Sequence, residues 1–191
     1  FKCGLLYERE GHVAPRTMLP LLVRRLRGAG ADVRFEAAVS DPIWTAASAG
    51  EIVIDCRGIA ARRDVEGLRG VRGEMAVVEA GGVEITRPVR LLHPRFPIYA
   101  VPWGGGRYMV GATSIESEYA GPVTVKSAID LLASATALNS GFRDASVIEM
   151  SAGIRPAFVD NVPRILARGR RLIVNGTYRH GFLLAPVLAQ I

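Results

Sequence analysis

Short apolar stretches alternate with glycine turns between residues 70 and 112, and this pattern limits the fold more than any other feature of the sequence. Such stretches, rich in β-branched and aromatic residues, are typical of antiparallel strands that follow one another in a sheet. The expected strands are 73–79, 83–86, 89–92, 98–103 and 108–112, with turns at Gly81-Gly82 and at Gly104 to Gly106. The sequence therefore predicts an antiparallel meander in the middle of the chain.

Helical and strand-like patterns alternate on either side of this meander. Apolar residues recur at helical spacing over 15–27 and over 125–138. In the second helix the expected apolar side consists of Ile129, Leu131, Leu132 and Ala135. Strands are expected at 31–37, 51–55, 146–154 and 171–174, of which the second and fourth are buried. Residues 41–50 are expected to form a loop or an irregular hairpin, and 181–190 a helix. Together they predict an α/β plus antiparallel β fold whose chain leaves one domain and returns to it.

Composition removes several functional classes. No apolar run approaches the ~20 residues that a membrane span needs. The two cysteines, Cys3 and Cys56, have no metal-ligand spacing, so we expect no metal, no disulfide and a reducing, cytoplasmic setting. The three histidines, His12, His93 and His180, lie in no pattern typical of a hydrolytic triad.

The net charge of +6 raises the question of nucleic-acid binding. It comes from arginine, since Lys2 and Lys126 are the only lysines, and the arginines are scattered without a basic helix face or a binding motif. We therefore expect no nucleic-acid partner. Arg16 and Arg57 are open to two interpretations, a pairing with nearby carboxylates or a contact with a cofactor.

Two segments carry chemistry that the rest of the sequence does not. Arg155 interrupts an apolar, strand-like stretch, and a buried arginine requires an anion because an unpaired interior charge costs several kcal/mol. From the residues alone, a salt bridge to an acid such as Asp160 is favoured over a bound ligand. The second segment, 171–186, is a strand that runs through a glycine-bracketed turn into a helix, and helix starts favour anions or electron-rich ring edges.

Eight ordered motifs resemble the D-amino-acid-oxidase superfamily, and within it the glycine oxidases of thiamine biosynthesis. They are Gly11 to Arg16, Val53 to Gly58, Val71 to Met75, Arg87-Pro88, Tyr99 to Pro102, Val110 to Thr113, Gly153 to Pro156 and Tyr178 to Pro186. The resemblance implies that Arg155 binds the substrate carboxylate and that Tyr99 and Arg179 lie near the substrate. It also implies that a turn wraps the flavin ring of FAD, formed by Gly176, Thr177, Tyr178, Arg179, His180, Gly181, Phe182 and Leu183.

The resemblance further implies how the chain is organised. Residues 13–69 and 153–191 would belong to a partial, glutathione-reductase-like FAD-binding domain that lacks its N-terminal βαβ unit and its G-x-G-x-x-G motif. Residues 1–12 and 70–152 would belong to an antiparallel substrate domain interleaved with it. Ser114 and Pro97 depart from the family pattern, as does the run Asp55-Cys56-Arg57.

The activity implied is oxidative deamination of glycine or a similar small amine to an imine, with O2 giving H2O2, for synthesis of the thiamine thiazole. The expected partners are a small amino-acid substrate, O2 and a second copy of the protein, and the chain alone is expected to bind FAD weakly and to be inactive. Two alternatives stay open: a related sarcosine or D-amino-acid oxidase, and a non-catalytic domain that binds a partner.

Overall fold

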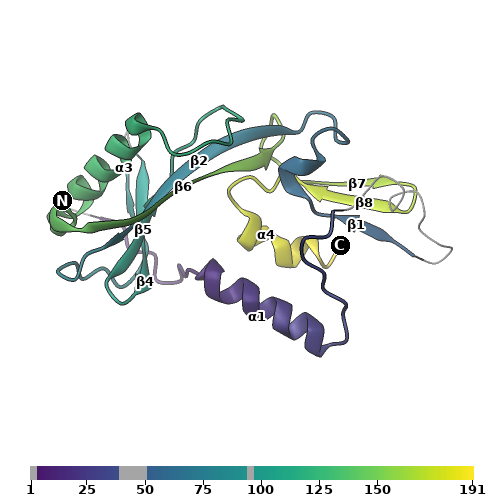
Figure 1. Cartoon of the computed structure of the whole chain (residues 1–191), viewed down its shortest axis with the longest axis horizontal. Helices are drawn as coiled ribbons and strands as arrows, with labels where there is room; N and C mark the ends of the chain where they lie inside the picture. The colour runs from purple at the N-terminus through teal and green to yellow at the C-terminus, as the bar shows by residue number, and fades with distance from the viewer. Residues whose placement is uncertain (1–3, 39–50, 94–96) are drawn as a thin grey trace. The chain divides into compact units, whose positions relative to one another are not determined.

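The computed structural model describes residues 4–38, 51–93 and 97–191, and its chain divides into two compact units (Figure 1). The first unit contains residues 1–37, 75–112 and 123–151. The second contains residues 38–74, 113–122 and 152–191, so the chain passes repeatedly between the two. Among the described residues, no helix combines the length and the apolar character needed to cross a bilayer.

A five-stranded sheet contains the predicted meander. Its strands are β2 (Arg69–Glu79), β3 (Val89–Leu91), β4 (Ile98–Gly104), β5 (Arg107–Gly111) and β6 (Ser146–Ala157), in the order β3-β4-β5-β2-β6. Figure 1 shows β2 and β6 as two long neighbouring strands. The antiparallel pairing of β3, β4, β5 and β2 confirms the meander. The strand expected at 83–86 is wrong: these residues leave the Gly81-Gly82 turn as irregular backbone, and Val83 accepts a hydrogen bond from Tyr108 through its carbonyl.

The core of the first unit lies between this sheet and α3 (Val125–Leu138), a helix with the predicted bounds. Thr124 caps the start of α3, because its side chain accepts from the N–H of Ser127 at 3.2 Å. Leu131, Ala135 and Leu138 are buried against the sheet. Ile129, expected on the apolar side, is 62% exposed, so the buried face is rotated away from it.

The first helix, α1 (Pro15–Gly28), also has the predicted extent, with Pro15 in its first turn, where its missing N–H costs nothing. The short η2 (Ser140–Asp144) follows α3. The strand expected at 31–37 is wrong. Residues 31–37 form an irregular segment, in which the Arg27 Cζ lies 5.6 Å from the centre of the Phe35 ring. Alternation alone does not make a strand, which needs a neighbour to complete its ladder.

The second unit is built on a three-stranded sheet in the order β1-β8-β7. It consists of β1 (Val53–Asp55), β7 (Arg164–Arg168) and β8 (Arg171–Asn175), together with η1 (Gly58–Ala61) and α4 (Gly181–Leu188). Phe158 and Ile173 are among the largest fully buried apolar side chains of the described residues. The buried strand expected at 51–55 is shorter and lies at the sheet edge, with Ile54 63% exposed. Sequence patterning missed β7.

A buried ion network fixes the end of β1. The Asp55 side chain has no exposed surface and accepts from the Arg57 Nε and Nη2 at 3.0 Å each and from Arg171 of β8. Both arginines also contact Asp64. Burial alone would raise the pKa of Asp55, but hydrogen bonds from Arg57 and Arg171 outweigh burial and lower that pKa to about 2. Of the two interpretations of Arg57, pairing with carboxylates is confirmed.

This network predicts a loss of stability in acid. Because the pKa of Asp55 in the folded chain is below its ordinary value, its contribution is present above about pH 4 and is lost as the pH falls toward 2. The loss should be about 2 kcal/mol in the free energy of unfolding, measured by urea titration at several pH values. Asp55→Asn should be less stable at pH 7 and lose less on acidification. Asp32→Asn, at an exposed site, should keep the wild-type loss; equal losses in all three proteins would contradict the prediction.

The turn after β8 depends on a glycine. Gly176 has φ +78, and a Cβ there would lie 2.3 Å from Cδ2 of the enclosed Phe158 ring. Gly176→Ala should lower the free energy of unfolding by about 2–4 kcal/mol, the sum of left-handed backbone strain and overpacking. Gly169→Ala is the matched control, because Gly169 also has a positive φ (+61) but open space around it. Equal losses in the two variants would show that the ring contact contributes nothing.

Candidate functional site

Three of the motif segments meet in the second unit. The N–H of Tyr178, in the turn after β8, donates to the carbonyl of Pro156 at the end of β6 at 3.1 Å. The Asn175 side chain donates to the carbonyl of Gly58 at 2.9 Å, and a Cβ on Gly58 would lie 3.6 Å from Pro156 Cγ. These contacts hold the segments that follow β1 and β8 next to the end of β6, at Pro156.

Arg155 lies immediately before this junction and is half-buried. Its Nη1 donates to the carbonyl of Thr113 at 3.1 Å. A Cβ on Gly73 of β2 would lie 2.1 Å from each of Cζ, Nη1 and Nη2, so the outer end of the guanidinium fills the space that a side chain at Gly73 would take. The Asp160 carboxylate, considered above as an internal partner, accepts from Arg164 at 3.0 Å. Arg155 is thus held between β2 and the segment that begins at Thr113.

A buried acid fixes that segment. Glu74 has a fully buried side chain, its N–H donates to the Thr113 hydroxyl at 2.9 Å, and its carbonyl accepts from the Thr113 N–H at 3.1 Å. Arg72, 2% exposed, neutralises Glu74 through Nε at 2.9 Å and Nη2 at 2.7 Å. Arg72 also donates to the carbonyls of Gly121 and Pro122, at 2.9 and 2.6 Å. Both ends of the 113–122 segment are therefore tied to β2.

The turn expected to contact a flavin has a strained backbone. Tyr178 adopts φ +50, a left-handed conformation that is unusual for an aromatic residue and that clusters at ligand sites. Its N–H is held by Pro156, and its hydroxyl lies 2.9 Å from the Ser114 hydroxyl. Ser114 directly follows the residue whose carbonyl accepts from Arg155. The turn and the Arg155 seat are thus linked at two points.

The start of α4 supplies donors that suit a flavin ring edge. The N–H groups of Gly181, Phe182 and Leu183 lie in the first turn of the helix, where no helical carbonyl can accept them and the dipole is positive. His180, the N-cap, makes no side-chain capping bond. Arg179 and His180 are exposed. The residues 176–183 therefore fit the electron-rich N1–O2 edge of a flavin by donor type.

Tyr99 belongs to the first unit. It lies on β4, half-buried, opposite Gly111 of β5, which in turn pairs with Met75 of β2. The side chain of Val101 shares its face of the sheet, opposite the face that Ile98 and Ala100 turn toward α3. Because Gly111 has no side chain, the Tyr99 ring has no side-chain neighbour at this paired position.

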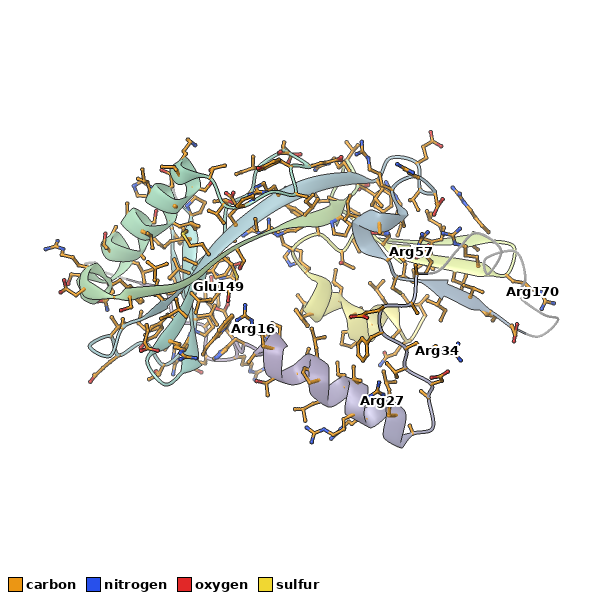
Figure 2. All side chains as sticks on the ribbon, in the orientation of Figure 1. Arg16, Arg27, Arg34, Arg57, Glu149 and Arg170 are labelled. Atoms are coloured by element: carbon orange, nitrogen blue, oxygen red, sulfur yellow. The ribbon has the colours of Figure 1, made fainter. Side chains whose placement is uncertain are left out.

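The same unit holds an ion pair between helix and sheet. Figure 2 shows Arg16, at the start of α1, directed toward Glu149 of β6. Arg16 Nη2 contacts both Glu149 oxygens at 2.7 Å, and its guanidinium lies 5.3 Å from the Trp103 ring centre. The hydrogen bond from Arg16 lowers the pKa of Glu149. Pairing with a carboxylate is therefore the confirmed interpretation of Arg16, and Trp103 packs against it.

The site residues expected from the sequence fall into two groups. Arg155 and the turn 176–183 are brought together in one unit by the bond between Tyr178 and Pro156. Tyr99 lies in the other unit. Sequence reasoning missed Gly73 and Thr113 as neighbours of Arg155, although these residues lie in two of the motifs that carry the family resemblance.

Comparisons with known proteins agree with this chemistry. The family described as "DAO: FAD dependent oxidoreductase" matches residues 1–191. The chain is 46% identical, over 189 residues, to the "Putative thiamine biosynthesis oxidoreductase ThiO" of Rhizobium etli, covering 99% of this chain and 56% of that protein. It is 31% identical, over 124 residues, to the glycine oxidase of Geobacillus kaustophilus, covering 61% of this chain and 31% of that one.

Solved structures show the same fold. The iminodiacetate oxidase of Chelativorans sp. BNC1 matches 92% of this chain and 52% of its own length, with a TM-score of 0.70 and 22% identity. The Geobacillus kaustophilus glycine oxidase structure matches 69% of this chain and 36% of its own, with a TM-score of 0.59 and 27% identity. The chain spans about half the length, or less, of the relatives it matches. Its full-length family match and its 46% identity establish that the chain belongs to the DAO family of FAD-dependent oxidoreductases.

Proposed function

We propose that this chain is the carboxyl-terminal part of an FAD-dependent oxidase that acts on glycine or a similarly small amine, in the synthesis of the thiamine thiazole. The observation that carries the proposal is the seat of Arg155, a half-buried guanidinium held against Gly73 and Thr113, next to the Tyr178 turn. A guanidinium held in one plane suits a planar carboxylate, which it binds through two parallel hydrogen bonds. The names of the Rhizobium and Geobacillus relatives support a glycine-type substrate.

The proposed roles need no nucleophile and no strong acid. Bound FAD would supply the redox chemistry, the two-electron oxidation of the amine to an imine with reduction of O2 to H2O2. Arg155 holds the substrate carboxylate and Arg179 lies near the substrate, and a substrate contact of Tyr99 is proposed from the family resemblance alone. The turn 176–183 donates backbone N–H groups to the ring edge. The protein contributes orientation and exclusion of water, which together supply much of the rate in such sites.

The second unit supports the view that more polypeptide completes the FAD-binding part. Among the described residues, β1 lies at one edge of its sheet. Ile54 in β1 is 63% exposed, and Ile52, just before it, is 66% exposed. No residue of α4 is buried, and Leu183 is 75% exposed. We propose that 13–69 and 153–191 form part of the FAD-binding domain, and that 1–12 and 70–152 form part of the substrate domain.

A peroxide assay tests the proposed activity. The assay uses a fusion protein. It joins residues 1–191 to the part of the Rhizobium relative that this chain does not match. Because the site is built around one carboxylate, the fusion should be yellow and should release H2O2 with glycine, sarcosine or D-alanine, and the ranking of the three identifies the substrate. A yellow fusion that oxidises none of these amines would overturn the proposal.

Arg155 should dominate substrate binding in that fusion. Replacing it with Ala removes two charge-assisted hydrogen bonds, so kcat/KM should fall by about 10²–10³. Arg155→Lys keeps the charge but loses the planar fork, and its loss should be smaller and mainly in KM. Arg143→Ala, at an exposed arginine of η2, is the control and should keep the wild-type kcat/KM. Wild-type kcat/KM in Arg155→Ala would remove Arg155 from the site.

The second candidate, a non-catalytic domain that binds a partner, is favoured by the exposed apolar residues of β1 and α4. The two candidates differ in whether the fusion retains yellow flavin. Purified residues 1–191 should be colourless near 450 nm, because they carry no G-x-G-x-x-G segment. The non-catalytic candidate requires that the fusion also stays colourless when FAD is added, whereas flavin retained by the fusion excludes it.

A further inference from the structure

We propose that Gly73 is a positioning residue: its missing side chain sets the plane and depth of the Arg155 guanidinium, and thereby the affinity for the substrate carboxylate. The proposal deepens the oxidase function proposed above and rests on it. It assigns a role to a strand residue that touches neither substrate nor cofactor.

The geometry comes from one close approach. A Cβ built on Gly73 would lie 2.1 Å from Cζ, from Nη1 and from Nη2 of Arg155. Cζ, Nη1 and Nη2 would be equally distant from this Cβ, and Nε is not among its three nearest atoms, so the Cβ would lie above the open end of the fork, over the gap between Nη1 and Nη2. The Nη end of the guanidinium therefore fills the space next to the Gly73 backbone. Any side chain at position 73 would occupy the volume that the guanidinium now fills.

The Thr113 carbonyl fixes the direction in which the Arg155 guanidinium points within its plane. It accepts from Arg155 Nη1 at 3.1 Å, and Thr113 is itself bonded to the backbone of Glu74, the residue after Gly73. The backbone under the guanidinium and the acceptor at its edge thus belong to one rigid piece. A carboxylate meets a fork already oriented, and pre-orientation lowers the entropy cost of binding.

An alanine at position 73 should separate this role from stability. The clashing atoms are the far end of a flexible side chain, so the guanidinium moves instead of the backbone. It must shift by about 1.4 Å to restore an ordinary contact of about 3.5 Å. Gly73 has no positive φ, and glycine within a strand is less favourable than alanine by about 0.5–1 kcal/mol, so folding should not suffer.

Gly70 provides the matched steric control. It lies on the same strand, and a Cβ there would lie 2.6 Å from Ile154 Cγ2 and 2.7 Å from Glu118 Cγ. Gly70→Ala therefore pushes on a stiff, branched side chain close to its own backbone, and it should lower the melting temperature. The two variants make the same chemical change on one strand and differ in which atoms must move.

The experiment measures acetate binding by residues 1–191, with the chemical shift of the Arg155 Nε–Hε group as the readout. Acetate is the probe because it carries the carboxylate and no amine. Gly73→Ala should weaken acetate binding at least about tenfold at an unchanged melting temperature. Gly70→Ala should keep the affinity and melt earlier. In an Arg155→Lys background, with backbone amide shifts as the readout, Gly73→Ala should change the affinity less than twofold, because no guanidinium remains to be displaced.

Each other outcome has a definite meaning. Wild-type affinity in Gly73→Ala overturns the positioning role, as does an equal loss in the Arg155 and Lys backgrounds. If wild-type protein binds no acetate, or Arg155→Ala binds it as well as wild type does, the carboxylate seat is wrong and both proposals fall. If the seat binds acetate as expected but the yellow fusion oxidises no amine, the oxidase proposal falls and the role of Gly73 in anion binding stands.

Discussion

The ion pair between Arg72 and Glu74 holds the second unit's site together. Both side chains are almost completely buried, and either charge alone would be too costly to enclose. Together they fix a stretch of β2, and through Thr113, Gly121 and Pro122 they fasten the segment that runs beside it. The Thr113 carbonyl, which accepts the hydrogen bond from Arg155, belongs to that segment. The position of Arg155 therefore depends on a salt bridge formed by two other residues.

This arrangement suits a reaction in which the protein orients and the cofactor carries the electrons. The described residues around the junction of β1, β6 and β8 supply a guanidinium, hydroxyl groups and backbone N–H groups. These are binding groups, and orientation of a small substrate against a ring is work that they perform well. The strained backbone of Tyr178 fits the same scheme, because the surrounding bonds to Pro156 and Ser114 hold a conformation that the residue would not adopt alone.

Periodicity predicted the elements that carry their own signal. The two long helices and the strands of the meander have strong local patterns, and the structure has them at nearly the expected residues. Periodicity failed where pairing decides. Residues 31–37 and 83–86 alternate but are not strands, while β7 was missed although it pairs fully with β8. Arg57 was recognised only as a possible partner of a nearby carboxylate, and Arg171 was not recognised as a partner of Asp55, because the two are distant in sequence.

The sequence by itself determined that Arg155 needs an anion, since a cation in an apolar stretch must be compensated, and that a glycine-bracketed turn leads into the last helix. The motifs also determined the family. Only the tertiary structure decided what lies against that cation: a glycine on another strand and a threonine carbonyl. The physical reason is that local patterns report what each residue requires, whereas the approach of a guanidinium to one backbone depends on how distant strands are aligned.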